Sequence, residues 1–213
     1  MSQPEENKEN EAADAQTITK GLKRLSHILK LREDFLADLL LDKDDWSFVV
    51  KSHALLEAAV CALLVVHLRK HELDEVLSEQ VEMSARIEMT KALGLTTDAD
   101  RKAMRALSNL RNRLVHNAKD TNFRFVEHFK NKDVRRNFSD TFGHAWPDPV
   151  PGTDPSTSRS DYVIANPKLA IFQSVTGIAL HVVSEMAKIQ DELMVQSLQS
   201  AILGHKRSPD AAQ

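Results

Sequence analysis

Residues 46–71 read WSFVVKSHALLEAAVCALLVVHLRKH and contain the most apolar run of this 213-residue chain. On a helix of 3.6 residues per turn, the apolar side chains of this run fall on most of the circumference instead of on one stripe. Such a helix must be covered by neighbours on several sides. The stretch therefore predicts a central, buried helix around which other helices pack.

The composition favours an all-α protein. The sequence is rich in Ala, Leu, Glu, Lys and Arg, which are good helix formers. It has only six glycines and 5% aromatic residues, which is poor in turn signals for a β-sandwich or barrel. We expect an antiparallel helical bundle of four to five main helices. The apolar spacing places its helices at about 17–41, 46–71, 73–93, 97–117 and 168–203, with a short one near 122–129.

Local signals mark several boundaries. Gly94 is a natural left-handed cap for the third helix, and Thr97 can cap the fourth. Three alternate prolines between Trp146 and Gly152 exclude a helix or a central strand there. We therefore expect a disordered acidic tail over residues 1–16 and a helical domain over 17–203. We also expect a Pro-rich loop insertion at 130–166 and a flexible tail over 204–213.

The sequence predicts a soluble, cytoplasmic protein. The N-terminus is acidic and lacks the apolar core of a signal peptide. The apolar run from Ala54 to Leu68 is interrupted by Glu57 and is predicted to be too short to span a membrane. The single cysteine, Cys61, lies in that run, which favours a buried structural thiol over a nucleophile.

The net charge of −3 conceals a strong pattern. Residues 1–15 carry five acids and one lysine, which gives −4, whereas residues 101–136 carry eleven Lys or Arg and three acids, which gives +8. The second segment suits a polyanion such as RNA. Its candidate nucleic-acid-binding residues are Arg105, Arg113, Lys119, Arg124, Arg135 and Arg136.

Aromatic residues are interleaved with these cations. Arg124 lies between Phe123 and Phe125, and Arg135 and Arg136 precede Phe138. The rings could stack on bases of single-stranded RNA. Alternatively, they lie buried beneath a solvated basic face.

The fourth helix ends with LSNLRNRLVHN at residues 107–117, which contains Arg111, Asn112 and His116. Asn112 and His116 are four residues apart and share a helix face. Arg111 and His116 diverge by roughly 140° around the helix axis. The two therefore converge on one atom only if the helix frays at His116 or if two copies of the motif meet across a dimer axis.

These residue types suit RNA cleavage without a metal. Imidazole can take a proton from the 2′-hydroxyl or give one to the leaving oxygen, and guanidinium stabilises charge building on the phosphate. Asn112 could hydrogen-bond the imidazole of His116. Alternatively, Asn112 and His116 serve folding by satisfying the open carbonyls of the helix end. We expect no cofactor and no metal: His67 and His71 are four apart but lack a third ligand at a suitable spacing.

An Arg-polar-x-x-x-His string at the end of a helix in an all-α domain resembles the signature of the HEPN superfamily. The central run from Ser52 to Glu57, the segment from Arg86 to Leu95 and the Pro-rich insertion before one terminal helix resemble its mannitol operon repressor branch. The resemblance covers about residues 20–200.

The HEPN resemblance implies a metal-independent endoribonuclease, of toxin or defence type, with Arg111, Asn112 and His116 as catalytic residues. It also implies a noncatalytic alternative, a regulator or adaptor that acts through a protein partner. HEPN toxins that are silenced by adenylylation carry a Tyr two residues after the His, where this chain has Ala118. That mode of silencing is therefore not expected.

Self-association is a further expectation. We expect a homodimer that brings two motif-bearing helix ends together. The last predicted helix carries apolar residues at alternating steps of three and four, typical of a heptad seam. This seam is either the inner face of the bundle or part of the dimer interface. Its members are Phe172, Val175, Ala179, Val182, Met186, Ile189 and Leu193.

Overall fold

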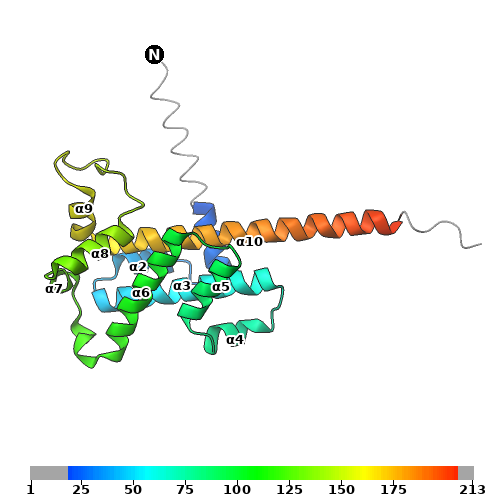
Figure 1. Cartoon of the computed structure of the whole chain (residues 1–213), viewed down its shortest axis with the longest axis horizontal. Coiled ribbons are helices and arrows are strands. Elements are labelled where there is room, and N and C mark those ends of the chain that lie inside the picture. The colour runs from blue at the N-terminus through cyan, green and yellow to red at the C-terminus, as the bar shows by residue number, and fades with distance from the viewer. Residues whose placement is uncertain (1–18, 206–213) are drawn as a thin grey trace, which may run out of the picture.

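The computed structural model describes residues 19–205, and every regular element within that range is helical (Figure 1). The all-α prediction is therefore confirmed for these residues. The predicted acidic tail, residues 1–16, lies outside them. Of the predicted C-terminal tail, residues 204 and 205 are still helical and 206–213 lie outside the described range.

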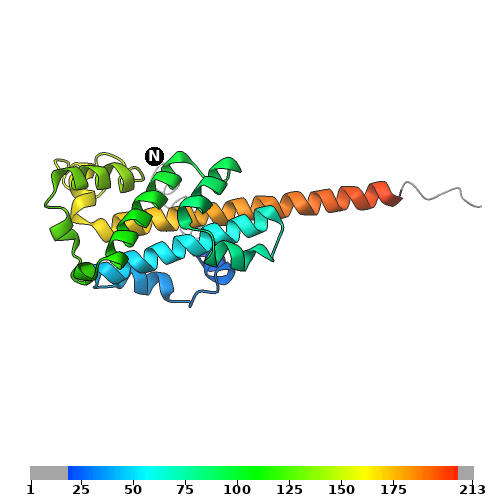
Figure 2. The same cartoon turned by 60° about the horizontal axis from the view of Figure 1, so that its bottom comes forward.

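The predicted central helix is α3 (Asp45–Leu68). Phe48 and Leu64 are both fully buried, although helix spacing places them roughly 160° apart around the axis. The helices α6 (Asp98–His116) and α10 (Pro167–His205) cover α3, as Figure 2 shows from a second direction. The apolar circumference of α3 is explained by this central position.

The direction of the two longest helices differs from the predicted antiparallel arrangement. Lys168 in the first turn of α10 forms an ion pair of 2.8 Å with Asp45 in the first turn of α3. The two helices therefore start at the same end of the molecule and run parallel (Figures 1 and 2). The intervening 98 residues (69–166) bring the chain back, and α6 within them runs against both. The prediction of antiparallel neighbours is wrong for this pair.

The first predicted helix, 17–41, is two helices. The first described helix stops at residue 28, and α2 (Phe35–Leu41) follows after a break. Lys30 adopts a left-handed conformation with φ of 52°, and the Leu31 amide donates back to the Ser26 carbonyl at 2.8 Å. This is the 6→1 bond with which helices often terminate, so the apolar spacing continues but the helix does not.

The third predicted helix, 73–93, is also divided, into α4 (Leu73–Glu79) and α5 (Met83–Ala92). The break lets both Leu77 of α4 and Ile87 of α5 point into the core, where each is almost fully buried. Gly94 has a φ of 67°, as the predicted left-handed cap requires.

The segment predicted to be one long loop, 130–166, contains two helices, α8 (Lys132–Phe142) and α9 (Arg159–Ala165). Asn131 caps α8 by accepting from the amides of Asp133 and Val134. Every fourth residue of α8, from Val134 through Phe138 to Phe142, packs on the core. The loop prediction is wrong except for residues 143–158, and the predicted helix near 122–129 is a turn of 3₁₀ helix (Ala118–Asn122) followed by α7 (Phe125–His128).

The last helix, α10, extends beyond the helices that pack against it. Val175, Ala179 and Val182 of the heptad seam are buried against the rest of this chain, so this part of the seam is an inner face. Residues 190–200 of α10 are exposed except for the half-buried Leu193, and this end of the helix projects from the bundle (Figures 1 and 2). Met194 and Leu198 on this projection are 65% and 54% exposed.

Two helices, α3 and α10, are long and apolar enough to cross a membrane by length and composition alone. The expectation that the central run is too short is therefore wrong as to length, because α3 has 24 residues. In this structure 61% and 56% of the apolar windows of these helices are buried inside the chain. That burial is what core helices require.

Candidate functional site

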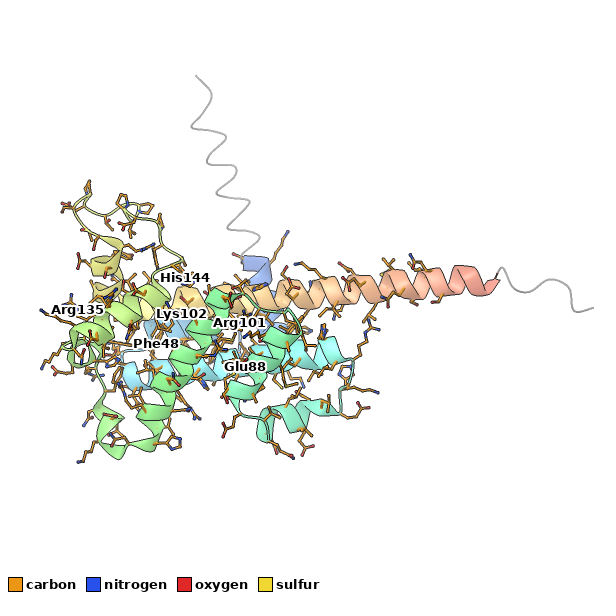
Figure 3. All side chains as sticks on the ribbon, in the orientation of Figure 1. Phe48, Glu88, Arg101, Lys102, Arg135 and His144 are labelled. Carbon is orange, nitrogen blue, oxygen red and sulfur yellow. The ribbon has the colours of Figure 1, made fainter. Side chains whose placement is uncertain are left out.

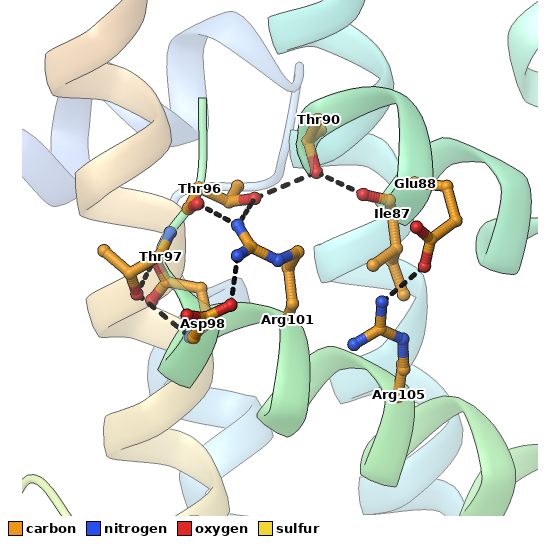
Figure 4. Close-up of polar contacts among 9 residues, drawn as sticks. Ile87, Glu88, Thr90, Thr96, Thr97, Asp98, Arg101 and Arg105 are labelled. Carbon is orange, nitrogen blue, oxygen red and sulfur yellow. Dashed lines mark hydrogen bonds and ion pairs between the residues drawn. The ribbon is translucent and has the colours of Figure 1, made fainter. Parts of the chain in front are cut away.

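The start of α6 is fixed by a dense polar junction with α5 (Figure 4). The Thr97 hydroxyl accepts from the Asp100 amide, and the Asp100 carboxylate accepts from the Thr97 amide, which forms a capping box. The buried Arg101 guanidinium donates to the Thr96 carbonyl and pairs with Asp98. The Thr96 hydroxyl donates to that of Thr90 on α5 at 3.0 Å. These bonds set the angle at which α6 leaves α5.

A cleft of about 610 Å³ opens between α5 and α6. The α6 side is lined by polar and cationic residues, and the α5 side, with the floor from α3, is rich in glutamates. The lining includes Arg105, Ser108, Asn109, Arg111, Asn112 and His116 from α6, Glu82 and Glu88 from the opposite wall, and Glu57 from α3. All three motif residues therefore lie on one cleft of a single chain.

The motif residues differ in how they are held. Arg111 is half-buried, and its Nη1 donates to Asn112 Oδ1 at 3.0 Å. Asn112 therefore bonds Arg111 and does not set the tautomer of His116, contrary to one sequence-based interpretation. The His116 side chain is exposed at the last position of α6. Its imidazole has no hydrogen bond or ion pair among residues 19–205. Its imidazole is free to meet a ligand in the cleft.

A buried polar chain forms the floor of the cleft. Glu57 accepts from Arg86 at 2.8 Å and lies 3.2 Å from His53 Nδ1. On its other side, His53 Nε2 lies 3.1 Å from the Ser108 hydroxyl. The His53 hydrogen bond, together with the charges of Arg86 and Arg111, holds the pKa of Glu57 below its ordinary value. Glu57 thus places a fixed negative charge beneath Arg111.

An ion pair bridges the two walls. Arg105 of α6 pairs with Glu88 of α5, and this hydrogen bond with Arg105 lowers the pKa of Glu88 (Figure 4). Sequence analysis had assigned Arg105 to RNA binding, and it does line the cleft. Glu57 and Glu88, which also line the cleft, were not predicted from the sequence. The i,i+4 spacing of His53 and Glu57 was a visible signal, but nothing in the sequence links Glu57 to Arg86, 29 positions away.

The other predicted RNA-binding residues lie elsewhere. Arg113, Lys119 and Arg124 line a separate hollow of about 330 Å³ beside His128. Burial and the neighbouring Arg113 lower the pKa of His128 to about 4. Arg135 and Arg136 line a third hollow, and Figure 3 shows Arg135 far from Glu88 of the cleft. The +8 segment therefore forms three surfaces and not one.

The phenylalanines beside these cations are core residues. Phe123, Phe125 and Phe138 are 8%, 3% and 6% exposed. The rings of Phe125, Phe129 and Phe138 contact one another edge-on or stacked. This supports the buried-aromatic alternative, because stacking on RNA bases would require exposed ring faces.

The side chains considered for other chemistry do not form a second site. Cys61 is buried, and burial together with Asp74 raises the pKa of its thiol to about 11. The thiol therefore stays protonated and poorly nucleophilic near neutral pH. Within residues 19–205, no group of three or more His, Cys, Asp or Glu side chains gathers as metal ligands would. His67 and His71 belong to no such group.

Neither protein-family models, nor curated proteins, nor solved structures gave a match to this chain. The HEPN resemblance thus rests on the residues and helix order of the chain itself.

Proposed function

We propose that this protein is a HEPN-type, metal-independent endoribonuclease of the cytoplasm, and that it cuts RNA in the cleft between α5 and α6. One observation carries the proposal. Arg111, Asn112 and His116 line one cleft of sufficient size for a nucleotide, together with Arg105. The side chains needed for phosphate binding and for proton transfer therefore share one space.

The roles follow from how each side chain is held. Arg111, half-buried and bonded to Asn112, is oriented to grip the phosphate as negative charge builds on it. His116, exposed and unpartnered among residues 19–205, transfers a proton as general base or general acid. Asn112 keeps the guanidinium of Arg111 in place. The 2′-hydroxyl of the RNA supplies the nucleophile.

RNA cleavage of this type needs both a base and an acid, whereas His116 is the one exposed imidazole on this cleft. We propose that a second copy of the chain supplies the other group in a homodimer, whose axis passes near the ends of the two α6 helices. The exposure of Asn112 and His116 supports this arrangement, because the helix end is open to a partner. Light scattering that gave only monomer at micromolar concentration would remove the composite site.

The test uses purified protein and fluorescent single-stranded RNA in the presence of a chelator. We expect cleavage that yields a 2′,3′-cyclic phosphate and a 5′-hydroxyl. The DNA strand of the same sequence should stay intact because it lacks the nucleophile. Cleavage of both strands would indicate a different chemistry, and absence of RNA cleavage would reject the proposal.

The second candidate is a noncatalytic regulator or adaptor related to the mannitol operon repressor branch. The projecting part of α10 favours it. Met194, Val195 and Leu198 are all at least half exposed there and lie within one turn of each other, so they form an apolar ridge suited to a protein partner. A regulator would lack RNA cleavage and would depend on this ridge, so Leu198→Glu should abolish its regulatory effect.

A further inference from the structure

The third hollow of the molecule lies between the start of α8 and the loop 143–158 that leads into α9. It measures about 410 Å³ and is separate from the cleft of the proposed activity. Figure 3 shows Arg135 of this hollow at the left end of the molecule, well away from Glu88 of the cleft. The Pro-rich loop forms one wall of the hollow. Without the loop, this face of α8 would be an open surface.

Four cations line the hollow, namely Lys132, Arg135 and Arg136 of α8 and Arg159 of α9. Two acids, Asp140 and Asp148, share the lining. Four positive charges and two negative ones leave a balance of +2, in a chain whose overall charge is −3.

The two acids are already engaged. Asp148 Oδ1 accepts from the Arg159 backbone amide at 3.3 Å, and Asp140 lies 3.8 Å from Arg136 Nε. By contrast, the side chains of Lys132 and Arg135 have no hydrogen bond or ion pair among residues 19–205. The hollow therefore keeps two free cations next to two that are held.

The wall on the loop side is built in advance. Arg159 Nη1 donates to the Trp146 carbonyl at 3.4 Å, which ties α9 to the loop. Val150 at the middle of the loop is 3% exposed, and its carbonyl accepts from the Thr153 hydroxyl at 2.7 Å. The Trp146 ring packs on that of Tyr162, with centroids 5.0 Å apart. These contacts hold the loop in place, so the pocket is preorganised for a ligand.

We propose that this hollow binds a dianionic phosphate group. The balance of +2 matches two negative charges, and guanidinium groups bind phosphate oxygens through paired hydrogen bonds. The Ser160 hydroxyl on the rim adds a neutral donor. The group can belong to a small phosphorylated molecule or to the 5′ end of an RNA strand. The RNA source rests on the proposed function, whereas the small-molecule source does not.

The first experiment titrates the full chain with inorganic phosphate at constant ionic strength, by calorimetry, against chloride. We expect saturable binding to the wild type. The double variant Lys132→Ala/Arg135→Ala should bind at least about tenfold more weakly, because two charge-assisted contacts are lost. Lys130→Ala is the matched control: it lies two residues before Lys132, is paired with Glu127 and does not line the hollow.

A charge-gain variant guards against trivial loss of folding. Asp140→Asn removes an acid from the lining, and its side chain is 58% exposed, so the fold should tolerate the change. Its affinity for phosphate should rise. Absence of saturable binding to the wild type, or equal binding by wild type and the double variant, would overturn the proposal.

The second experiment identifies the source of the phosphate. Binding of a short RNA with a 5′-phosphate is compared with that of the same RNA with a 5′-hydroxyl, in a His116→Ala background that should be unable to cut. A preference for the phosphorylated RNA that the double variant loses would assign the hollow to RNA ends. Phosphate binding without that preference would assign it to a small phosphorylated molecule. Neither result depends on cleavage, so failure of the nuclease proposal would leave the phosphate site standing.

Discussion

The two ends of α6 are built in opposite ways. At its start, the capping box of Thr97 and Asp100 and the buried Arg101 use nearly every polar group to hold the helix in place. At its end, Asn112 and His116 are exposed, and neither side chain donates to a carbonyl of the helix within residues 19–205. The end is held by a remote residue instead, because Trp46 Nε1 donates to the Leu114 carbonyl at 3.3 Å.

The sequence left open whether Asn112 and His116 serve RNA cleavage or folding, and the difference between the two helix ends bears on that choice. If Asn112 and His116 served folding, they would satisfy the carbonyls at the end of α6. Trp46 of α3 takes one of these carbonyls, and Asn112 bonds Arg111. Within residues 19–205, the side chains of Asn112 and His116 therefore do not satisfy the carbonyls at the end of α6. Polar side chains that line a cleft without such bonds are what the proposed function requires.

The largest effect is expected at the start of α6. Arg101→Ala would remove the donor to the Thr96 carbonyl and should destabilise the fold by about 2–3 kcal/mol, because that buried carbonyl would lose its charged partner. The measurement is urea unfolding followed by circular dichroism. Arg113→Ala near the other end is the comparison: its exposed guanidinium contacts His128 and lies over the Phe123 ring, so we expect a loss of only about 1 kcal/mol or less. Equal losses would erase the contrast between the two ends.

The second prediction concerns how stability near the end of α6 depends on pH. It rests on His128, which lies beside Arg113. The pKa of His128 is lowered from 6.5 to about 4, so the unfolded chain takes up a proton there before the folded chain does. The free energy of unfolding should therefore fall as the pH drops from 6.5 towards 4.

The measurement compares urea unfolding of wild type and His128→Gln at both ends of that pH range. The variant should lose less stability than the wild type on acidification, because its residue 128 cannot take up a proton. An equal loss of stability in the wild type and in His128→Gln would show that His128 is not the source of the pH dependence.

A smaller effect is expected from Trp46→Phe. It removes the indole N–H from the Leu114 carbonyl but keeps an aromatic ring, so we expect a loss of about 1 kcal/mol. The same unfolding assay measures it. Unchanged stability would mean that the end of α6 is held by other groups.

The sequence predicted those features that depend on neighbours along the chain. Thr97, Gly94 and the apolar circumference of α3 each follow from local chemistry. Lys30 was missed because its left-handed turn interrupts a helix without breaking the apolar spacing. The helix α8 was not predicted because the prolines at 147, 149 and 151 were taken to exclude a helix from the whole segment. The apolar stripe of Val134, Phe138 and Phe142 ends before those prolines begin.

The features that depend on tertiary structure could not be read from the sequence. The parallel course of α3 and α10 rests on tertiary contacts, among them the ion pair of Asp45 and Lys168, which are 123 residues apart. Within the site, Arg111, Asn112 and His116 were identified from spacing. Their shared cleft with Glu57 and Glu88 depends on the angle between α5 and α6, which the Arg101 junction sets.

The most direct measurement is the rate of RNA cleavage, in chelator, by wild type and His116→Ala at equal concentrations of folded protein. His71→Ala, another exposed histidine that lies outside the cleft, is the control. The account predicts that His116→Ala cuts roughly 10²–10⁴-fold more slowly, the range lost with a general acid or base, while its unfolding curve matches the wild type. Equal cleavage by His116→Ala and wild type, or unfolding of His116→Ala, would contradict the claim that this end of α6 is functional and not structural.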